Sequence, residues 1–171
     1  MQQLGRLTAD EFKKQPKTPI VLVYDNVRSA LNVGAAFRTA DSFRLEGIAL
    51  CGITAQPPHK EIFKTALGAT ETVAWWHTEK TTDALLDLRR KGYTILAVEQ
   101  VTNRVWLHEF TVDPAAKYAL VFGNEVDGVS DAVLALVDAC LEVPQLGAKH
   151  SLNISVCTGI VVWELMRSRF S

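Results

Sequence analysis

Short apolar runs alternate with helix-like segments along most of this chain, and this alternation restricts its fold more than any other feature. The runs predict strands at PIVLVYD (19–25), GIALCG (47–52), YTILAVE (93–99), YALVFG (118–123) and LEV (141–143), with ETVAWWHT (71–78) extended. The segments between them predict helices at 32–43, 60–67, 82–92, 130–140 and from Ser151 onward. Such alternation is typical of an α/β fold, a parallel sheet with helices on both faces.

The chain length and the absence of an internal repeat or linker favour a single domain that spans residues 1–171. Residues 1–18 read as an N-terminal extension. Within it, Thr8 followed by Glu11 matches a capping box, so we expect a short helix that stops before Pro16.

Composition excludes several classes of function. The net charge of −1 argues against nonspecific binding to nucleic acid, so a polyanion would have to meet a local basic patch. Cys51, Cys140 and Cys157 form no CxxC pair, the histidines are dispersed, and no metal site is predicted. Free cysteines, a polar N-terminus and the lack of a membrane-length apolar run lead us to expect a cytoplasmic protein.

The expected sheet also predicts where a ligand would bind. Ligands of parallel sheets bind beyond the carboxyl ends of the strands, here the loops after Tyr24, Val98, Phe122 and Val143. No G-x-G spacing and no P-loop occur, so a common nucleotide site is not predicted.

The first stretch of interest is DNVRSALNVGAAFRTADSF (25–43). Wound as a helix, it places a core stripe on one side: Val33, Ala36, Phe37, Ala40 and Phe43. Arg38 points the other way. Geometry alone favours a solvated arginine paired with Asp41, and the alternative is an arginine facing a pocket, with Gly34 leaving room beside it. Asn32 occupies the expected cap position of this helix.

The second stretch, LVFGNEVDGVSD (120–131), runs from a strand through a polar loop into a helix capped by Ser130. It fits a plain turn in which glycines satisfy unusual backbone angles. Alternatively, Gly123 lets a ligand approach the backbone, with Asn124 and Glu125 at the rim.

The third stretch is EVPQLGAKHSLNISVCTGIVVWEL (142–165). Polar residues crowd the first turns of its predicted helix (Ser151, Asn153, Ser155), while apolar residues surround the remainder. A helix that is apolar all round is buried on every side. We therefore expect a second subunit to cover it, unless it is simply central to the monomer.

Together, NVGAAFRTADSF (32–43), VFGNEVDGVS (121–130) and VPQLGAKHSLNISV (143–156) resemble the three ordered motifs of the TrmH/SpoU branch of the SPOUT methyltransferase superfamily. The resemblance implies S-adenosylmethionine-dependent methylation of a ribose 2′-hydroxyl in tRNA or rRNA. It also implies a homodimer and a deep trefoil knot in the C-terminal part of the sheet. A catalytically silent RNA-binding or cofactor-sensing module on the same fold is the alternative.

The same resemblance implies roles for individual residues. The polar groups carried over to the reaction centre are Arg38, Asn32, Glu125, Ser151 and Asn153. The residues that the resemblance assigns to cofactor binding are Gly123, Val143, Leu146 and Leu152. Val98, at the end of another strand, is a further candidate. Because a guanidinium stays protonated to about pH 12, Arg38 suits phosphate binding and alkoxide stabilisation better than proton abstraction. Glu125 stays open as a proton acceptor.

RNA contact would have to come from basic residues in or beside the motif loops. The candidates for a phosphate-binding surface are Arg28, Lys60, Lys64 and Lys149. Taken singly, each is more commonly a solvated side chain. All four polar groups Arg38, Glu125, Ser151 and Asn153 are present, which favours the enzyme over the silent module.

Overall fold

A computed structural model describes residues 8–148 and 151–170 and contains a seven-stranded sheet of parallel strands. The strand order is β3-β2-β1-β6-β4-β7-β5. The strands are β1 (Thr18–Asp25), β2 (Leu45–Cys51), β3 (Trp75–Thr78), β4 (Tyr93–Val98), β5 (Arg104–Trp106), β6 (Lys117–Phe122) and β7 (Ala139–Glu142). The predicted α/β class and the parallel sheet are confirmed.

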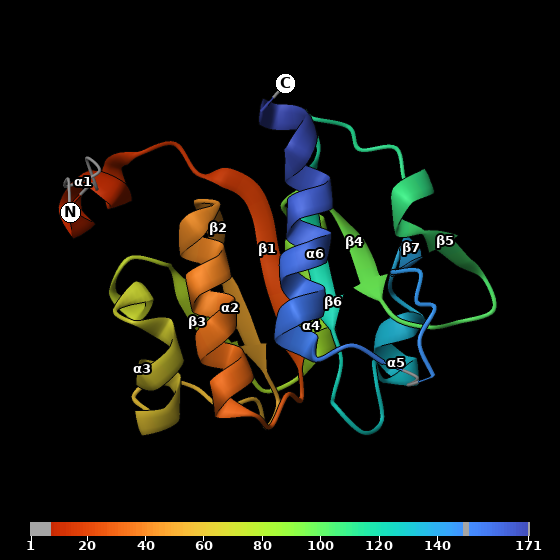
Figure 1. The fold of residues 1–171 in the computed structure, drawn as a ribbon, viewed down its shortest axis with the longest axis horizontal. Helices are drawn as coiled ribbons and strands as arrows, with labels where there is room; N and C mark the ends of the chain where they lie inside the picture. The colour runs from red at the N-terminus through yellow and green to blue at the C-terminus, as the bar shows by residue number, and fades with distance from the viewer. Residues whose placement is uncertain (1–7, 149–150, 171) are drawn as a thin grey trace.

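Helices lie on both faces of this sheet, as predicted. They are α1 (Ala9–Lys14), α2 (Ala30–Ser42), α3 (Lys60–Ala66), α4 (Thr81–Arg90), α5 (Asp131–Leu134) and α6 (Ile154–Arg167), with short 3-10 turns η1 (Ala69–Glu71), η2 (Leu107–Glu109) and η3 (Ser168–Phe170). In Figure 1, α2, α3 and α6 lie in front of the sheet and α4 lies behind it. None of the helices within the described residues has the length and apolar character needed to span a membrane.

The central strand β1 shows why both faces are covered. Ile20, Leu22 and Tyr24 point into the core shared with α2 and α6, whereas Val21 and Val23 point into the core shared with α4. Successive side chains of a strand alternate between faces, so an unbroken apolar run needs a layer on each side.

The helix predicted at 130–140 is wrong in its length. It ends at Leu134, and the chain is already in β7 at Ala139. The cause is Asp138, whose backbone N–H donates to the carbonyl of Ile95 over 2.8 Å while its carboxylate accepts from the Ile95 N–H over 2.7 Å. These contacts hold the segment beside β4 and end the helix early.

Two predicted helix starts also shift. The last helix begins at Ile154 and not at Ser151, because Asn153 is its N-cap and accepts a hydrogen bond from the second helical residue. In α2 the cap is Ser29, which accepts from the N–H of Asn32 over 3.3 Å. Asn32 is therefore a residue of the first helical turn, which frees its side chain for other contacts.

The capping box predicted in the N-terminal extension is present. Thr8 accepts from the N–H of Glu11, and the Glu11 carboxylate accepts from the N–H of Thr8 over 2.8 Å. The helix ends at Lys14, ahead of Pro16, as expected.

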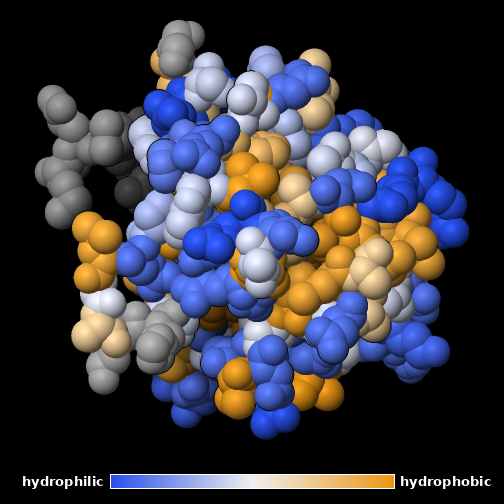
Figure 2. Space-filling view, turned by 90° about the vertical axis from the view of Figure 1, so that its right-hand side faces the viewer, coloured by the Kyte–Doolittle hydropathy of each residue, from blue (hydrophilic) through white to orange (hydrophobic). Residues whose placement is uncertain are grey.

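The edge strand β5 was not predicted, because three residues are too few to show a period. Arg104 fixes it: its Nε atom pairs with the Glu142 carboxylate on β7 at 2.8 Å, and its guanidinium lies over the Trp106 ring. Figure 2 looks onto the side that carries β5 and β7, where hydrophobic residues gather over the middle of the face among hydrophilic ones.

Candidate functional site

A pocket of about 430 Å³ opens beyond the carboxyl ends of β4, β6 and β7. This is the edge of the sheet at which a ligand was expected. The described residues that line it are Asn32, 98–100, 122–126, Gly128, 141–143, Gln145, 151–154 and Cys157. Loops after Val98, Phe122 and Glu142 thus contribute, and the loop after Tyr24 does not.

Most of the predicted site residues meet in this pocket. Its lining includes Asn32, Glu125, Ser151 and Asn153 from the expected reaction centre, and Gly123, Val143, Leu152 and Val98 from the expected cofactor contacts. Two do not line it. Leu146 is fully exposed to solvent, and Arg38 is an exposed residue of α2.

A hydrogen-bond network joins the three motif segments at the mouth of the pocket. The Asn153 amide donates to Oδ1 of Asn32 at 3.3 Å, and the Asn32 amide donates to Glu125 at 3.4 Å. The Glu125 carboxylate also accepts from the backbone N–H groups of Arg28 (3.3 Å) and Ser29 (3.2 Å). A carboxylate at the N-terminus of a helix is stabilised by the free N–H groups there. Glu125 therefore anchors the start of α2 while facing the pocket.

Gly123 is required by its own loop. A side chain there would place a Cβ 2.1 Å from the carbonyl carbon of Gly128 and 2.2 Å from the nitrogen of Val129. Asn124 and Gly128 exchange two backbone hydrogen bonds of 2.9 Å, and the Asn124 amide donates to the carbonyl of Asn26. Backbone atoms of the same loop fill the space beside Gly123. The glycine therefore shapes the pocket wall by allowing the loop to fold this closely.

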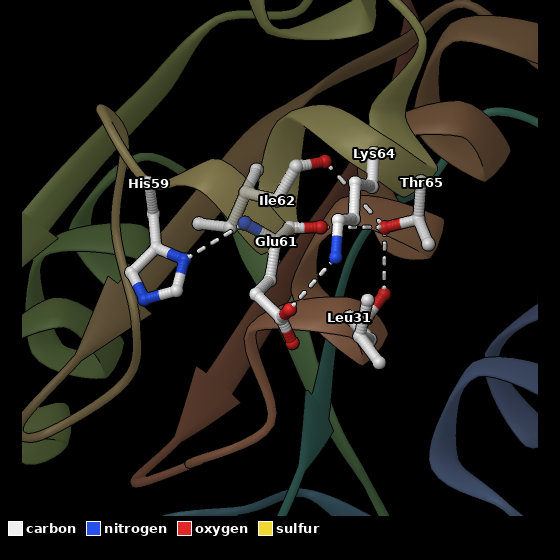
Figure 3. A network of polar contacts seen from close by, with 6 residues as sticks. All are labelled: Leu31, His59, Glu61, Ile62, Lys64 and Thr65. Carbon is white, nitrogen blue, oxygen red and sulfur yellow. Dashed lines mark hydrogen bonds and ion pairs between the residues drawn. The ribbon is translucent and has the colours of Figure 1, made fainter.

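Gly34 has a different role from the one expected. A Cβ at this position would lie 2.0 Å from Oγ1 of Thr65 and 2.4 Å from the carbonyl oxygen of Ile62. The Thr65 hydroxyl donates to the carbonyl of Leu31 over 2.9 Å, as Figure 3 shows. Gly34 therefore lets α3 pack tightly on α2, and it does not make room beside Arg38.

Arg38 lies apart from the network. The ion pairs among the described residues do not include the expected pairing with Asp41, whose carboxylate accepts a hydrogen bond from the hydroxyl of Thr72. Arg38 also does not line the pocket of its own chain. Its guanidinium is thus available for an external anion.

The candidate RNA-binding residues lie in more than one place. Arg28 is exposed directly before α2 and next to Glu125 in the network. Lys60 and Lys64 are exposed on α3, and Figure 1 shows α2 between α3 and α6. Lys64 pairs with Glu61 at 3.2 Å (Figure 3). Lys149 lies outside the described residues.

Sequence reasoning missed Glu99, which follows the last residue of β4 and lines the pocket. Its position directly after Val98, at a strand end already singled out, was the available signal. Cys157 lines the opposite wall on α6. Burial raises the pKa of the Cys157 thiol to about 11, and the charge of Glu99 adds to this rise. The thiol is therefore neutral at physiological pH.

The fold and the site together define an α/β protein with a pocket at the carboxyl-terminal edge of its parallel sheet. The chain belongs to the SpoU rRNA methylase family, whose sequence profile matches residues 19–163.

Individual relatives agree with this assignment. The 23S rRNA (guanosine-2'-O-)-methyltransferase RlmB of Vibrio parahaemolyticus is 28% identical over 99% of this chain and 67% of its own length. An AdoMet-bound rRNA methyltransferase from Sinorhizobium meliloti is 26% identical with a TM-score of 0.83; the match covers 97% of this chain and 62% of that one. The A. aeolicus TrmH/SpoU tRNA modifying enzyme is 26% identical with a TM-score of 0.83, over 95% and 81% of the two chains.

Proposed function

We propose that this chain methylates a ribose 2′-hydroxyl of ribosomal or transfer RNA, with S-adenosylmethionine as methyl donor. The observation that carries the proposal is the Asn153–Asn32–Glu125 network, which brings one residue from each motif to the mouth of a single pocket. The names of the relatives support it: one is a 23S rRNA 2′-O-methyltransferase and another a tRNA modifying enzyme.

The pocket fits the proposed cofactor in size and in chemistry. A volume of about 430 Å³ lies in the usual range for small-molecule sites. Val98, Val143 and Leu152 offer apolar surface, and acidic side chains at the wall suit a positively charged ligand. When bound, S-adenosylmethionine supplies an electrophilic methyl group on a sulfonium.

The protein residues would then position the ribose and help its hydroxyl lose a proton. Arg38 stays charged, so we assign it to the RNA phosphate and to the developing alkoxide. The Glu125 oxygens already accept three hydrogen bonds from protein donors, which favours a positioning role over proton abstraction. Ser151 and Asn153 orient the ribose from the other side.

A homodimer belongs to this proposal. Helix α6 leaves Val156, Ile160 and Trp163 exposed, the last by 52%, which argues against a helix central to the monomer. Contiguous exposed apolar surface is typical of an interface. Because Arg38 does not line its own pocket, we propose that dimerisation brings Arg38 of the partner subunit to the site.

We also infer a deep trefoil knot in the C-terminal part of the sheet. It is supported by the place of β7, late in the sequence yet between β4 and β5 in the sheet, and by membership of the family. The proposed RNA surface comprises Arg28, Lys60, Lys64 and Lys149, and the cytoplasm is the proposed site of action because both RNA classes occur there.

Transfer of label from methyl-labelled S-adenosylmethionine to total bacterial RNA tests the function. We expect the wild-type protein to label RNA and the Arg38→Ala variant to fail. No label in any RNA, despite cofactor binding measured by calorimetry, would favour the silent module.

A further inference from the structure

The carboxylate of Glu99 is held in a fixed position at the wall of the pocket. Its Oε2 atom accepts from the N–H of Val129 over 2.8 Å, and Oε1 accepts from the N–H of Gln100 over 2.8 Å. Gly128 lies so close that a Cβ there would be 2.3 Å from Oε2. The side chain is thus clamped between the end of β4 and the loop after β6.

The charge of Glu99 differs from that of its acidic neighbours in the pocket. Glu142 is neutralised by Arg104 at 2.8 Å, and Glu125 lies at the N-terminus of α2, where the helix dipole contributes a partial positive charge. Glu99 accepts hydrogen bonds from the backbone N–H groups of Gln100 and Val129, and neither of these residues lies in a helix. Among the described residues that line the pocket there is no lysine, arginine or histidine. Glu99 therefore carries a negative charge that no described cation compensates.

The electrostatic field of the Glu99 carboxylate extends across the pocket to α6. Cys157 lines the pocket from α6, and Glu99 contributes to the raised pKa of its thiol, after burial. A ligand between β4 and α6 would sit in the same field. In a partly buried site, opposite charges attract more strongly than in bulk water.

We propose that Glu99 is a specificity-determining residue that makes the pocket bind the sulfonium cation of the methyl donor more tightly than the neutral thioether product. This inference rests on the proposed function. S-adenosylmethionine and S-adenosylhomocysteine differ by one methyl group and one positive charge, and are otherwise the same. A fixed carboxylate in the pocket raises the affinity for the positively charged donor. When methyl transfer removes that charge, the affinity for the product is lower.

The test is the ratio of two dissociation constants, product over donor, measured by calorimetry for wild type and Glu99→Gln. Glutamine keeps an oxygen for the Val129 N–H but has no charge. Because each ratio compares two ligands on one protein, general damage to the pocket cancels. We expect the ratio to fall about five- to tenfold, as for a charge pair screened by a partly wet site.

Matched controls separate charge from structure. Glu109→Gln removes an exposed carboxylate that does not line the pocket, and should leave the ratio unchanged. If Glu99→Gln does not fold, the wild-type protein still provides a test with sinefungin, an analogue carrying a protonated amine near the position of the sulfonium. Sinefungin should bind more tightly than S-adenosylhomocysteine.

An unchanged ratio in Glu99→Gln, or an equal loss of both ligands, would overturn the inference and leave the proposed function standing. Weaker binding of sinefungin than of S-adenosylhomocysteine would also overturn it. Failure of wild-type protein to bind any of the three ligands would instead contradict the proposed function itself.

Discussion

The side-chain amide of Asn153 donates a hydrogen bond of 3.3 Å to Oδ1 of Asn32, although 121 positions separate these residues in the sequence. Asn153 caps α6, and Asn32 lies in the first turn of α2 and donates to Glu125. One bond thus ties the segment before α6 to the helix that carries Arg38. We expect this link to control catalysis more than stability.

Asn153→Asp tests the link. The aspartate keeps an oxygen for the N–H of Ser155, so the helix cap survives, but it cannot donate to Asn32. If the Asn32 amide turns over to donate to the new carboxylate, it no longer donates to Glu125. We expect an unchanged melting temperature and methyl transfer reduced at least about tenfold.

Asn153→Ala is the comparison, since it loses both the cap and the link. It should cost about 1 kcal/mol of unfolding free energy in addition to activity. Full methyl transfer by Asn153→Asp would show that the link has no catalytic role.

Arg38→Ala should separate catalysis from cofactor binding. The side chain is exposed and lies outside the pocket, so stability should change by less than about 0.5 kcal/mol. Calorimetry should show nearly unchanged affinity for S-adenosylmethionine, while the rate of methyl transfer falls by about 100-fold or more. Loss of cofactor affinity in this variant would mean that Arg38 belongs to the cofactor site.

Gly123→Val should damage the pocket through the loop after β6. Its Cβ would meet the backbone of Gly128 and Val129 at 2.1 to 2.2 Å, and backbone cannot move aside cheaply. We expect a loss of about 1–3 kcal/mol in unfolding free energy and weaker cofactor binding. Gly147→Ala is the control, because no atom of the described residues lies within 4 Å of its added Cβ. Wild-type stability in Gly123→Val would contradict this role.

Ile160→Asp tests the proposed dimer. Ile160 lies on the exposed apolar side of α6 beside Val156 and Trp163, so a charge there should oppose burial against a second copy. Light scattering should find the wild type as a dimer at micromolar concentration and the variant as a monomer. A wild-type monomer would contradict the proposed dimer and leave Arg38 outside the pocket lining.

The sequence was sufficient to predict the parallel sheet, except for its edge strand β5, and the edge of the sheet at which a ligand would bind. Unbroken apolar runs such as 19–25 and 118–123, bounded by turn residues, indicate strands that are buried on both faces. The end of the helix at 130–140 was not predictable, because it depends on Asp138 reaching Ile95, a contact between distant segments. Local pattern contains no information of that kind.

Eight of the residues predicted for the reaction centre and the cofactor line one pocket, and their roles stay a prediction. The family resemblance assigned Asn32, Glu125 and Asn153 to one reaction centre. In the structure these three residues are joined by hydrogen bonds. The space beside Gly34 is used by α3, and only the three-dimensional packing distinguishes such a close approach of protein atoms from room for a ligand. Glu99 was missed since its charge matters only when the neighbouring carboxylates are seen to be compensated.

The position of the transferred methyl group tests the central claim most directly. RNA labelled by the wild-type protein should be hydrolysed in alkali, which cleaves only where the 2′-hydroxyl is free. We expect the label to survive in alkali-resistant dinucleotides, because the ribose hydroxyl carries the methyl group. Label recovered in mononucleotides, on a base, would contradict ribose methylation and place the chemistry of this pocket in another class.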